Sequence, residues 1–148
     1  MNIYGHRGAR GLYPENTLDG FKKVLDFHIN GIELDIVISS DKQIVVSHEP
    51  WMNHLFCLDP DGNEITKSTK KIHNIFAMDY EQICQYDCGT KKNPLFPNQH
   101  SWFATKPLLK SVFNLLREKT NEHFVLFLEV KSHPNWYNIF QPPPSELA

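Results

Sequence analysis

The sequence has no run of 18 or more apolar residues, so no transmembrane helix is expected. It also has no charged segment followed by an apolar segment at its N-terminus, which predicts the absence of a secretory signal and a cytoplasmic location. An excess of basic residues is missing too: the formal net charge is −2, which argues against an electrostatic nucleic-acid binder. The remaining class is a soluble globular protein, and 148 residues suit a single domain.

Cysteine is scarce, with only Cys57, Cys84 and Cys88. An odd number of cysteines without a CxxC pair argues against a disulfide framework and against a thiolate zinc site. We therefore expect three reduced cysteines, as is usual in cytosolic proteins.

Apolar stretches and helical periodicity predict the order of the secondary structure. Strands are predicted at residues 2–5, 32–38, 44–47 and 124–131, and helices at residues 18–28 and from residue 107. Buried strands separated by helices favour a parallel α/β protein. The turn at residues 39–43 is too short for a crossover helix, so its flanking strands either form a hairpin or meet where the chain doubles back irregularly.

Residues 49–106 differ from the rest because they are rich in proline, glycine, asparagine and aspartate and have weak periodicity. The stretch DPDGNE at residues 59–64 is a strong turn signal. We interpret this region as a loop-rich insertion with a helix near residues 79–86. The tail QPPPSELA is predicted to be loose, since three consecutive prolines continue neither a helix nor a central strand.

Unusual polar residues lie at or near the ends of the four predicted strands. In parallel barrels the carboxyl ends of the strands face the active site, so these side chains are expected to converge. Residues two positions apart on a strand project to the same side, as at positions 33 and 35 and again at 129 and 131. The residues concerned are His6, Arg7, Glu33, Asp35, His48, Glu129 and Lys131.

These residue types together indicate phosphodiester hydrolysis. Three carboxylates in apolar strands suit a hard divalent cation, Mg²⁺ or Ca²⁺, better than zinc. Two histidines supply a general acid and a general base near neutral pH, and an arginine and a lysine supply positive charge for a phosphate. The alternative is structural: each buried acid taken singly is more simply explained as the partner of Arg7 or Lys131 in an ion pair.

The order and spacing of five motifs resemble the glycerophosphodiester phosphodiesterase family. The resemblance covers about residues 2–131 and is strongest over residues 3–48. Shorter segments, Asp87-Cys88-Gly89 and Lys106-Pro107-Leu108, also look like that family. The five motifs are His6-Arg7-Gly8, Pro14-Glu15-Asn16-Thr17, Glu33-x-Asp35, Val45-Val46-x-His48 and Glu129-x-Lys131.

The resemblance implies a TIM-barrel fold and hydrolysis of glycerophosphodiesters to glycerol 3-phosphate and an alcohol, in lipid and glycerol metabolism. It implies one divalent cation, Mg²⁺ or Ca²⁺, and a small-molecule substrate. Glu15 and Asn16 lie in the family's first loop. A side-chain oxygen of Asn16 or Thr17 can cap the following helix, and Asn16 is taken as the cap. The implied roles are an acid–base pair, His6 and His48; phosphate contacts, Arg7 and Lys131; and metal ligands, Glu33, Asp35 and Glu129.

The sequence departs from the family pattern in two respects. Glu49 stands where the family usually has aspartate after the second histidine. In addition, a complete barrel needs roughly 200 residues or more, whereas this chain reaches about the fourth strand. We therefore expect residues 1–148 to form one partial barrel domain, with the insertion at residues 49–106 following the third strand.

Two functions follow from this partial barrel. The first is a metal-dependent phosphodiesterase. The second is a catalytically incompetent barrel half that binds only phosphate or a partner chain, either a missing half or a second copy. A sphingomyelin-directed phospholipase D of the same superfamily is disfavoured, because those proteins are secreted and disulfide-bonded.

Overall fold

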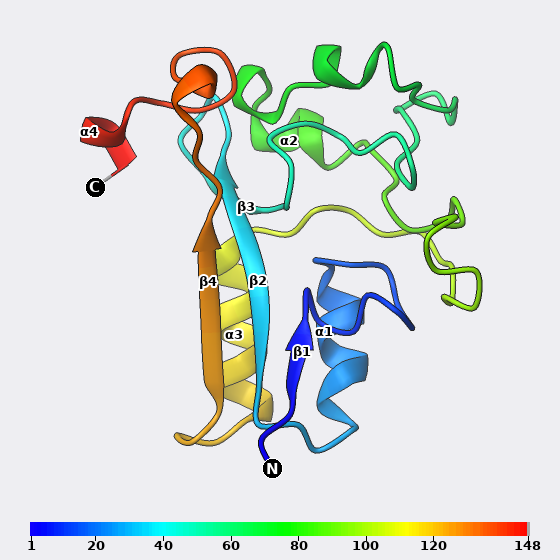
Figure 1. Ribbon diagram of the computed structural model, residues 1–148, viewed down its shortest axis with the longest axis vertical. Coiled ribbons are helices and arrows are strands. Elements are labelled where there is room, and N and C mark those ends of the chain that lie inside the picture. The colour runs from blue at the N-terminus through cyan, green and yellow to red at the C-terminus, as the bar shows by residue number, and fades with distance from the viewer. Residues whose placement is uncertain (148) are drawn as a thin grey trace.

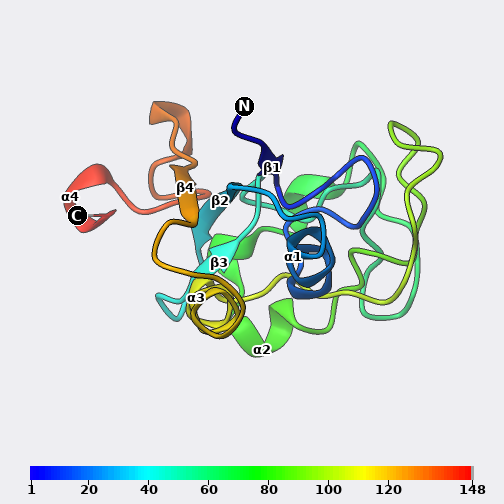
Figure 2. The same cartoon turned by 90° about the horizontal axis from the view of Figure 1, so that it is seen from below.

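The computed structural model describes residues 1–147 and is built around one long central strand, β2 (Gly31–Ile38). Strands β1 (Tyr4–His6) and β4 (Val125–Val130) pair with β2 in parallel, on opposite sides of it. Helices α1 (Leu18–Leu25) and α3 (Leu109–Lys119) both cover one face of this sheet (Figures 1 and 2). The opposite face carries the candidate site.

The alternation of side chains along β2 explains which face the helices cover. Ile32 and Leu34 are fully buried against the helices. Each such side chain contributes about 1.5–3 kcal/mol when it is removed from water. Because successive residues point to opposite faces, Glu33 and Asp35 must lie on the other side of the sheet. The same core includes Phe21, Val24, Val46, Leu109, Val112 and Leu116.

The end of β2 extends past its parallel neighbours and pairs with β3 (Ile44–Val46) in an antiparallel hairpin. The pairing with β4 ends at Ile36, and the pairing with β3 runs from Ile36 to Ile38. The hairpin alternative for residues 39–43 is therefore confirmed. Within residues 1–147 the sheet has four strands, does not close, and is parallel except for β3.

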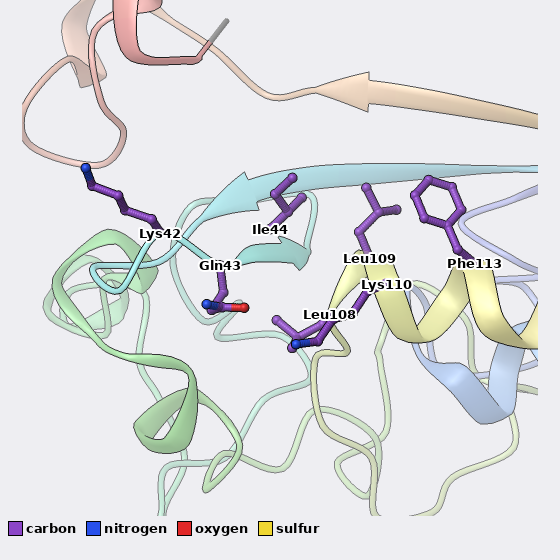
Figure 3. Close-up of a pocket in the computed structure, with 7 residues that line it drawn as sticks. All are labelled: Lys42, Gln43, Ile44, Leu108, Leu109, Lys110 and Phe113. Atoms are coloured by element: carbon purple, nitrogen blue, oxygen red, sulfur yellow. The ribbon is translucent and has the colours of Figure 1, made fainter.

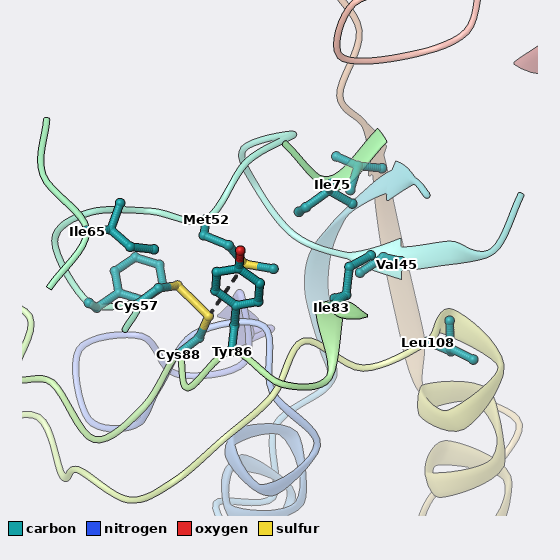
Figure 4. Packing of buried hydrophobic residues seen from close by; sticks show 11 residues of the cluster. Val45, Met52, Cys57, Ile65, Ile75, Ile83, Tyr86, Cys88 and Leu108 are labelled. Atoms are coloured by element: carbon teal, nitrogen blue, oxygen red, sulfur yellow. Dashed lines mark hydrogen bonds between the residues drawn. A yellow bond between two sulfur atoms is a disulfide. The ribbon is translucent and has the colours of Figure 1, made fainter. Parts of the chain in front are cut away.

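The segment between β3 and α3 holds only short elements. They are η1 (Lys70–Ile72), η2 (Ile75–Ala77) and α2 (Tyr80–Ile83), so a helix within residues 79–86 is confirmed. The segment has its own apolar core, shown in Figure 4, which includes Met52, Ile75 and Ile83.

A disulfide between Cys57 and Cys88 lies inside this second core (Figure 4). The expectation of three reduced cysteines is therefore wrong, and only Cys84 keeps a free thiol. The backbone explains the pairing, because the amide of Leu58 donates to the carbonyl of Asp87 at 2.7 Å and brings the neighbouring cysteines together. A contact between residues 31 positions apart has no local sequence signal.

Other expectations need smaller corrections. Helix α1 ends at Leu25, three residues before the predicted end at residue 28. Phe113 on α3 is 42% exposed, although it lies four residues after the buried Leu109, a spacing that predicts a shared apolar face. Within residues 141–147 the tail is not loose, because it forms α4 (Pro144–Leu147), and η3 (Pro134–Trp136) precedes it; Ala148 lies outside the described residues. Pro144 begins α4, the first-turn position at which a helix tolerates proline. The side chain of Gln141 is buried and donates to the hydroxyl of Ser132 at 2.8 Å.

Strand β4 presents apolar side chains to solvent on both of its faces. Within residues 1–147 its outer edge pairs with no other strand. Four of its six residues are 38–53% exposed: Val125, Phe127, Leu128 and Val130. An exposed apolar edge of this kind is a surface on which another strand can pair.

The helices are short relative to a bilayer. Within the described part of the chain, none combines the length and the apolar character that crossing a membrane requires.

The disulfide provides a first test of this architecture. Replacing Cys57 and Cys88 with alanine should lower the free energy of unfolding by about 3 kcal/mol, because the loop between them is no longer closed in the unfolded chain. Urea denaturation of oxidised protein measures this loss. Adding a reductant should reproduce it, and Cys84→Ala should have no comparable effect. Equal stability of the oxidised wild type and the double variant would contradict the disulfide.

Candidate active site

Strand register brings four of the candidate residues side by side. His6 is the partner of Glu33 across β1 and β2, and Asp35 is the partner of Glu129 across β2 and β4. Since paired residues in a sheet share a face, all four project away from the helices. One oxygen atom from each of the three acids lies within 4.8 Å of the others, close enough to bind one cation.

The loop after β1 turns sharply at the site. The chain bends so tightly that a Cβ on Gly5 would lie 2.1 Å from the carbonyl oxygen of Gly8, so only glycine fits at position 5. Arg7 adopts a left-handed backbone (φ 51°), and its amide donates to Glu33 Oε2 at 3.0 Å. The ring of His6 stays accessible, with Nε2 3.7 Å from the same oxygen. This bend therefore sets both His6 and Arg7 beside Glu33.

Asp35 is fully buried and is surrounded by polar partners. Its Oδ2 accepts a hydrogen bond from Asn16 Nδ2 at 2.9 Å and lies 3.2 Å from Arg7 Nε. Arg7 Nη1 also donates to Glu15 at 2.8 Å. Of the two candidate caps of α1, Asn16 is therefore not the cap. Thr17 is, and its hydroxyl accepts from the amide of Gly20 at 3.1 Å.

Lys131 follows β4 and faces two of the acids. Its Nζ lies 3.0 Å from Asp35 Oδ1 and donates to Glu129. Burial alone would lower the pKa of Lys131, but these two hydrogen bonds outweigh burial and raise the pKa. Lys131 is therefore a protonated, largely buried cation beside the carboxylates.

His48 reaches the site by a route that the parallel-strand rule does not describe. It follows β3, which runs antiparallel, and the amide of Ser47 donates to the carbonyl of Asp35 at 2.9 Å. The hairpin thus returns the chain along β2 until Ser47 lies beside Asp35. His48 Nδ1 lies 2.9 Å from Glu49 Oε1, a hydrogen bond between neighbouring residues.

Glu49 is a strongly acidic group in this setting. Burial alone would raise its pKa, but the hydrogen bond from His48 and the positive charge of Lys106 outweigh burial and lower the pKa to about 2. Its negative charge is therefore retained throughout the neutral and mildly acidic range.

Lys106 is a site residue that sequence reasoning missed. It is buried, and burial lowers its pKa, while the charges of Glu49, Glu15 and Asp35 act in the opposite direction. Its segment is attached to neighbouring elements, because Tyr80 donates to the carbonyl of Lys106 at 3.2 Å. The motif at residues 106–108 pointed to the segment, but nothing in the sequence indicates that this lysine is buried, since lysine is almost always exposed.

The donor set fits a divalent cation. Oε1 of Glu33 is buried and has no hydrogen-bond partner within residues 1–147, and all three candidate ligands are carboxylates. Five carboxylates face three basic side chains here, so acidic groups outnumber basic groups by two. Buried charge of one sign is costly, so a cation such as Mg²⁺ or Ca²⁺ would stabilise the arrangement. The five carboxylates are Glu15, Glu33, Asp35, Glu49 and Glu129, and the three basic residues are Arg7, Lys106 and Lys131.

A separate cavity of about 290 Å³ lies between β3 and the start of α3 (Figure 3). None of the predicted site residues lines it, so it is distinct from the group of acids. Its lining consists of Lys42, Gln43, Ile44, Leu108, Leu109, Lys110 and Phe113.

Comparison with known proteins adds an independent finding. A model of the glycerophosphoryl diester phosphodiesterase family matches residues 6–136. A putative glycerophosphodiester phosphodiesterase of Bacillus subtilis, YhdW, is 27% identical over 139 residues, which are 94% of this chain and 48% of that protein. A glycerophosphodiester phosphodiesterase of Bacillus altitudinis is also 27% identical, over 88% of this chain and 45% of that protein.

Solved structures give the same result for the fold. A putative glycerophosphoryl diester phosphodiesterase from Silicibacter pomeroyi superposes with a TM-score of 0.83 at 30% identity, covering 92% of this chain and 47% of that one. A phosphodiesterase from Oleispira antarctica, solved with the product sn-glycerol-3-phosphate, superposes with a TM-score of 0.64 at 22% identity, over 92% and 47% of the two chains. The fold is therefore a partial TIM barrel, and the chain spans about half the length of the relatives it matches.

The low pKa of Glu49 leads to a prediction about acid stability. A carboxylate with a lower pKa in the folded state stabilises the fold above its unfolded pKa of 4.5, and this contribution is lost as the pH falls from 4.5 towards 2. Glu49→Gln should therefore cost up to about 3 kcal/mol near pH 6 and much less near pH 2.5. Urea denaturation at several pH values measures the difference.

The solvent-exposed Glu64 provides a matched control for this experiment. Its side chain is 74% exposed, so Glu64→Gln should change the stability by less than about 1 kcal/mol at either pH. A cost of Glu49→Gln that does not vary with pH would contradict the low pKa.

Proposed function

The chain belongs to the glycerophosphoryl diester phosphodiesterase family, and from this membership we propose that it hydrolyses glycerophosphodiesters to glycerol 3-phosphate and an alcohol. The observation that carries the proposal is the convergence of Glu33, Asp35 and Glu129 on the sheet face that also bears His6. Relatives named glycerophosphodiester phosphodiesterase support the same general chemistry. The reaction would belong to lipid and glycerol metabolism.

Glu33, Asp35 and Glu129 would hold one divalent cation, Mg²⁺ or Ca²⁺. When bound, such a cation supplies positive charge that polarises a phosphoryl oxygen and makes an oxygen nucleophile more acidic.

Arg7 and Lys131 would bind the phosphate of the substrate. Arg7 Nη1 and Nε already face Glu15 and Asp35, so Nη2 is the part of the guanidinium left for a phosphate oxygen. Lys131 is held beside the acids by its contacts with Asp35 and Glu129. Two positive groups on opposite sides of Asp35 would orient the phosphate above the sheet.

His6 and His48 would transfer the protons. One imidazole takes the proton of the attacking oxygen, from water or from the neighbouring glycerol hydroxyl, as that oxygen bonds to phosphorus. In the second case the first product is a cyclic phosphate, and water must then open the ring to give glycerol 3-phosphate. The other donates a proton to the alcohol oxygen as its bond to phosphorus breaks. His6 is open to a substrate, because its side chain is 60% exposed.

A second candidate function is a catalytically incompetent barrel half that binds phosphate or a partner chain. The observation that favours it is the exposed apolar surface of β4, to which a missing half or a second copy could pair. In both cases we propose that residues 1–148 form one partial domain. Residues 49–106 would be an insertion within it that holds Lys106 against the site.

Substitution and metal removal separate the two functions. His6→Ala and His48→Ala should each reduce hydrolysis of glycerophosphocholine by about 10²-fold or more, because general acid–base catalysis contributes that much. Removing divalent cations with EDTA should do the same, and adding Mg²⁺ or Ca²⁺ should restore activity. The assay is phosphodiester cleavage measured by release of glycerol 3-phosphate.

Calorimetric titration with Mg²⁺ and Ca²⁺ provides the control. Binding should persist in both histidine variants and should weaken in Glu33→Gln, but not in Glu64→Gln. Full hydrolysis in a histidine variant would refute the acid–base assignment. Cation binding by a wild-type chain that cleaves nothing would favour the second function.

A further inference from the structure

The two site histidines are held in different ways. His6 presents Nε2 towards Glu33 at 3.7 Å, and its side chain is mostly exposed. His48 instead uses Nδ1, which lies 2.9 Å from Glu49 Oε1, and its side chain is 31% exposed. Only His48 therefore has a carboxylate within hydrogen-bond distance, on the side of the ring nearest the backbone.

This contact fixes the position of the ring proton of His48. An ionised carboxylate only accepts hydrogen bonds, so the hydrogen must be on Nδ1. In neutral imidazole the other nitrogen is then an acceptor. The pair therefore leaves Nε2 of His48 unprotonated and available to a reacting group.

The environment of Glu49 keeps its carboxylate in place. Its Oε2 is buried and has no hydrogen-bond partner within the described chain, whereas Oε1 lies 2.9 Å from His48 Nδ1. The side chain of Asn53 also favours the charged form of Glu49. The buried cation Lys106 favours the charged form of Glu49. The segment of Lys106 is in turn joined to β3, because the amide of Val46 donates to the carbonyl of Pro107 at 2.8 Å.

We propose that Glu49 is a positioning residue, which holds the imidazole of His48 in the Nδ1-protonated form with Nε2 free for proton transfer. The inference rests on the proposed function for the role of His48. The arrangement follows the general logic in which a carboxylate selects the tautomer and orientation of a catalytic histidine. It requires no contact between Glu49 and the substrate.

Nitrogen NMR of the histidine rings tests the proposal without any assay of activity. In ¹⁵N-labelled chain 1–148, the two-bond ring correlations report which nitrogen carries the hydrogen, and His48→Gln identifies the His48 signals. Above the titration range of histidine, His48 should show a single Nδ1–H form. Glu49→Ala should convert it to a mixture of both tautomers, and Glu49→Asp should keep the Nδ1–H form.

The chain offers a matched control in Glu122 and His123. These are also neighbours in sequence, with 3.8 Å between carboxylate and ring nitrogen, but both side chains are more than 85% exposed. His123 should show mixed tautomers in the wild type, and Glu122→Ala should not change them. If Glu49→Ala fails to fold, Glu49→Met removes the acceptor while filling a similar volume. Mixed tautomers at His48 in the wild type, or an unchanged Nδ1–H form in the folded Ala or Met variant, would overturn the proposal.

Kinetics then separates this inference from the proposed function. Glu49→Ala should lower kcat by about 10- to 100-fold, because the imidazole of His48 is no longer held in its orientation. The KM for glycerophosphocholine should stay within about twofold of the wild-type value. In the His48→Gln background the same change should add little, because the two residues act as a unit. A chain with the expected tautomers but no hydrolysis would refute the proposed function alone. A hydrolytic chain in which Glu49→Ala changes neither kcat nor the tautomer would refute the positioning role alone.

Discussion

The polar structure of this protein depends on the burial of one carboxylate, Asp35. It lies on the central strand with none of its surface exposed, and an unpaired charge at that depth would cost several kcal/mol. Three side chains compensate it, and each comes from a different part of the chain: Arg7 from the loop after β1, Asn16 from the residues before α1, and Lys131 from the end of β4. The compensation of this single charge therefore joins three separate segments of the chain at one point.

The length of β2 is the second constraint. Its first six residues pair with β4, and the rest of the strand extends beyond the parallel sheet, where the chain returns antiparallel and pairs with it. That return is β3, and it leads directly to His48. The segment that contains Lys106 then lies beside β3, and an isolated β-bridge between Val45 and Leu108 joins the two. One overhanging strand thus brings both a candidate catalytic residue and a buried cation to the acids.

The sequence was informative wherever the determining interaction is local. The period-two alternation along β2 and β4 predicted that Glu33 and Asp35 share a face, because strand geometry alone sets that relation. Spacing likewise predicted α3, and turn length restricted residues 39–43 to a hairpin or an irregular reversal. Three features were not predictable in this way: the disulfide, the burial of Lys106 and the hydrogen bond from Asn16 to Asp35. Each depends on residues that are distant in sequence and that only the folded chain brings together.

The asymmetry of the two histidines follows from the same architecture. His6 ends a parallel strand, where its ring stands over the sheet beside Glu33 and is open to solvent. His48 follows an antiparallel strand, where the amide of Ser47 already donates to the carbonyl of Asp35 and the residue after His48 supplies a carboxylate to the ring. Acid–base chemistry needs two groups that differ in protonation, and differences of environment are how proteins create such pairs. The hairpin therefore places the second histidine in an environment unlike that of the first: His48 is bonded to a carboxylate, whereas His6 is open to solvent.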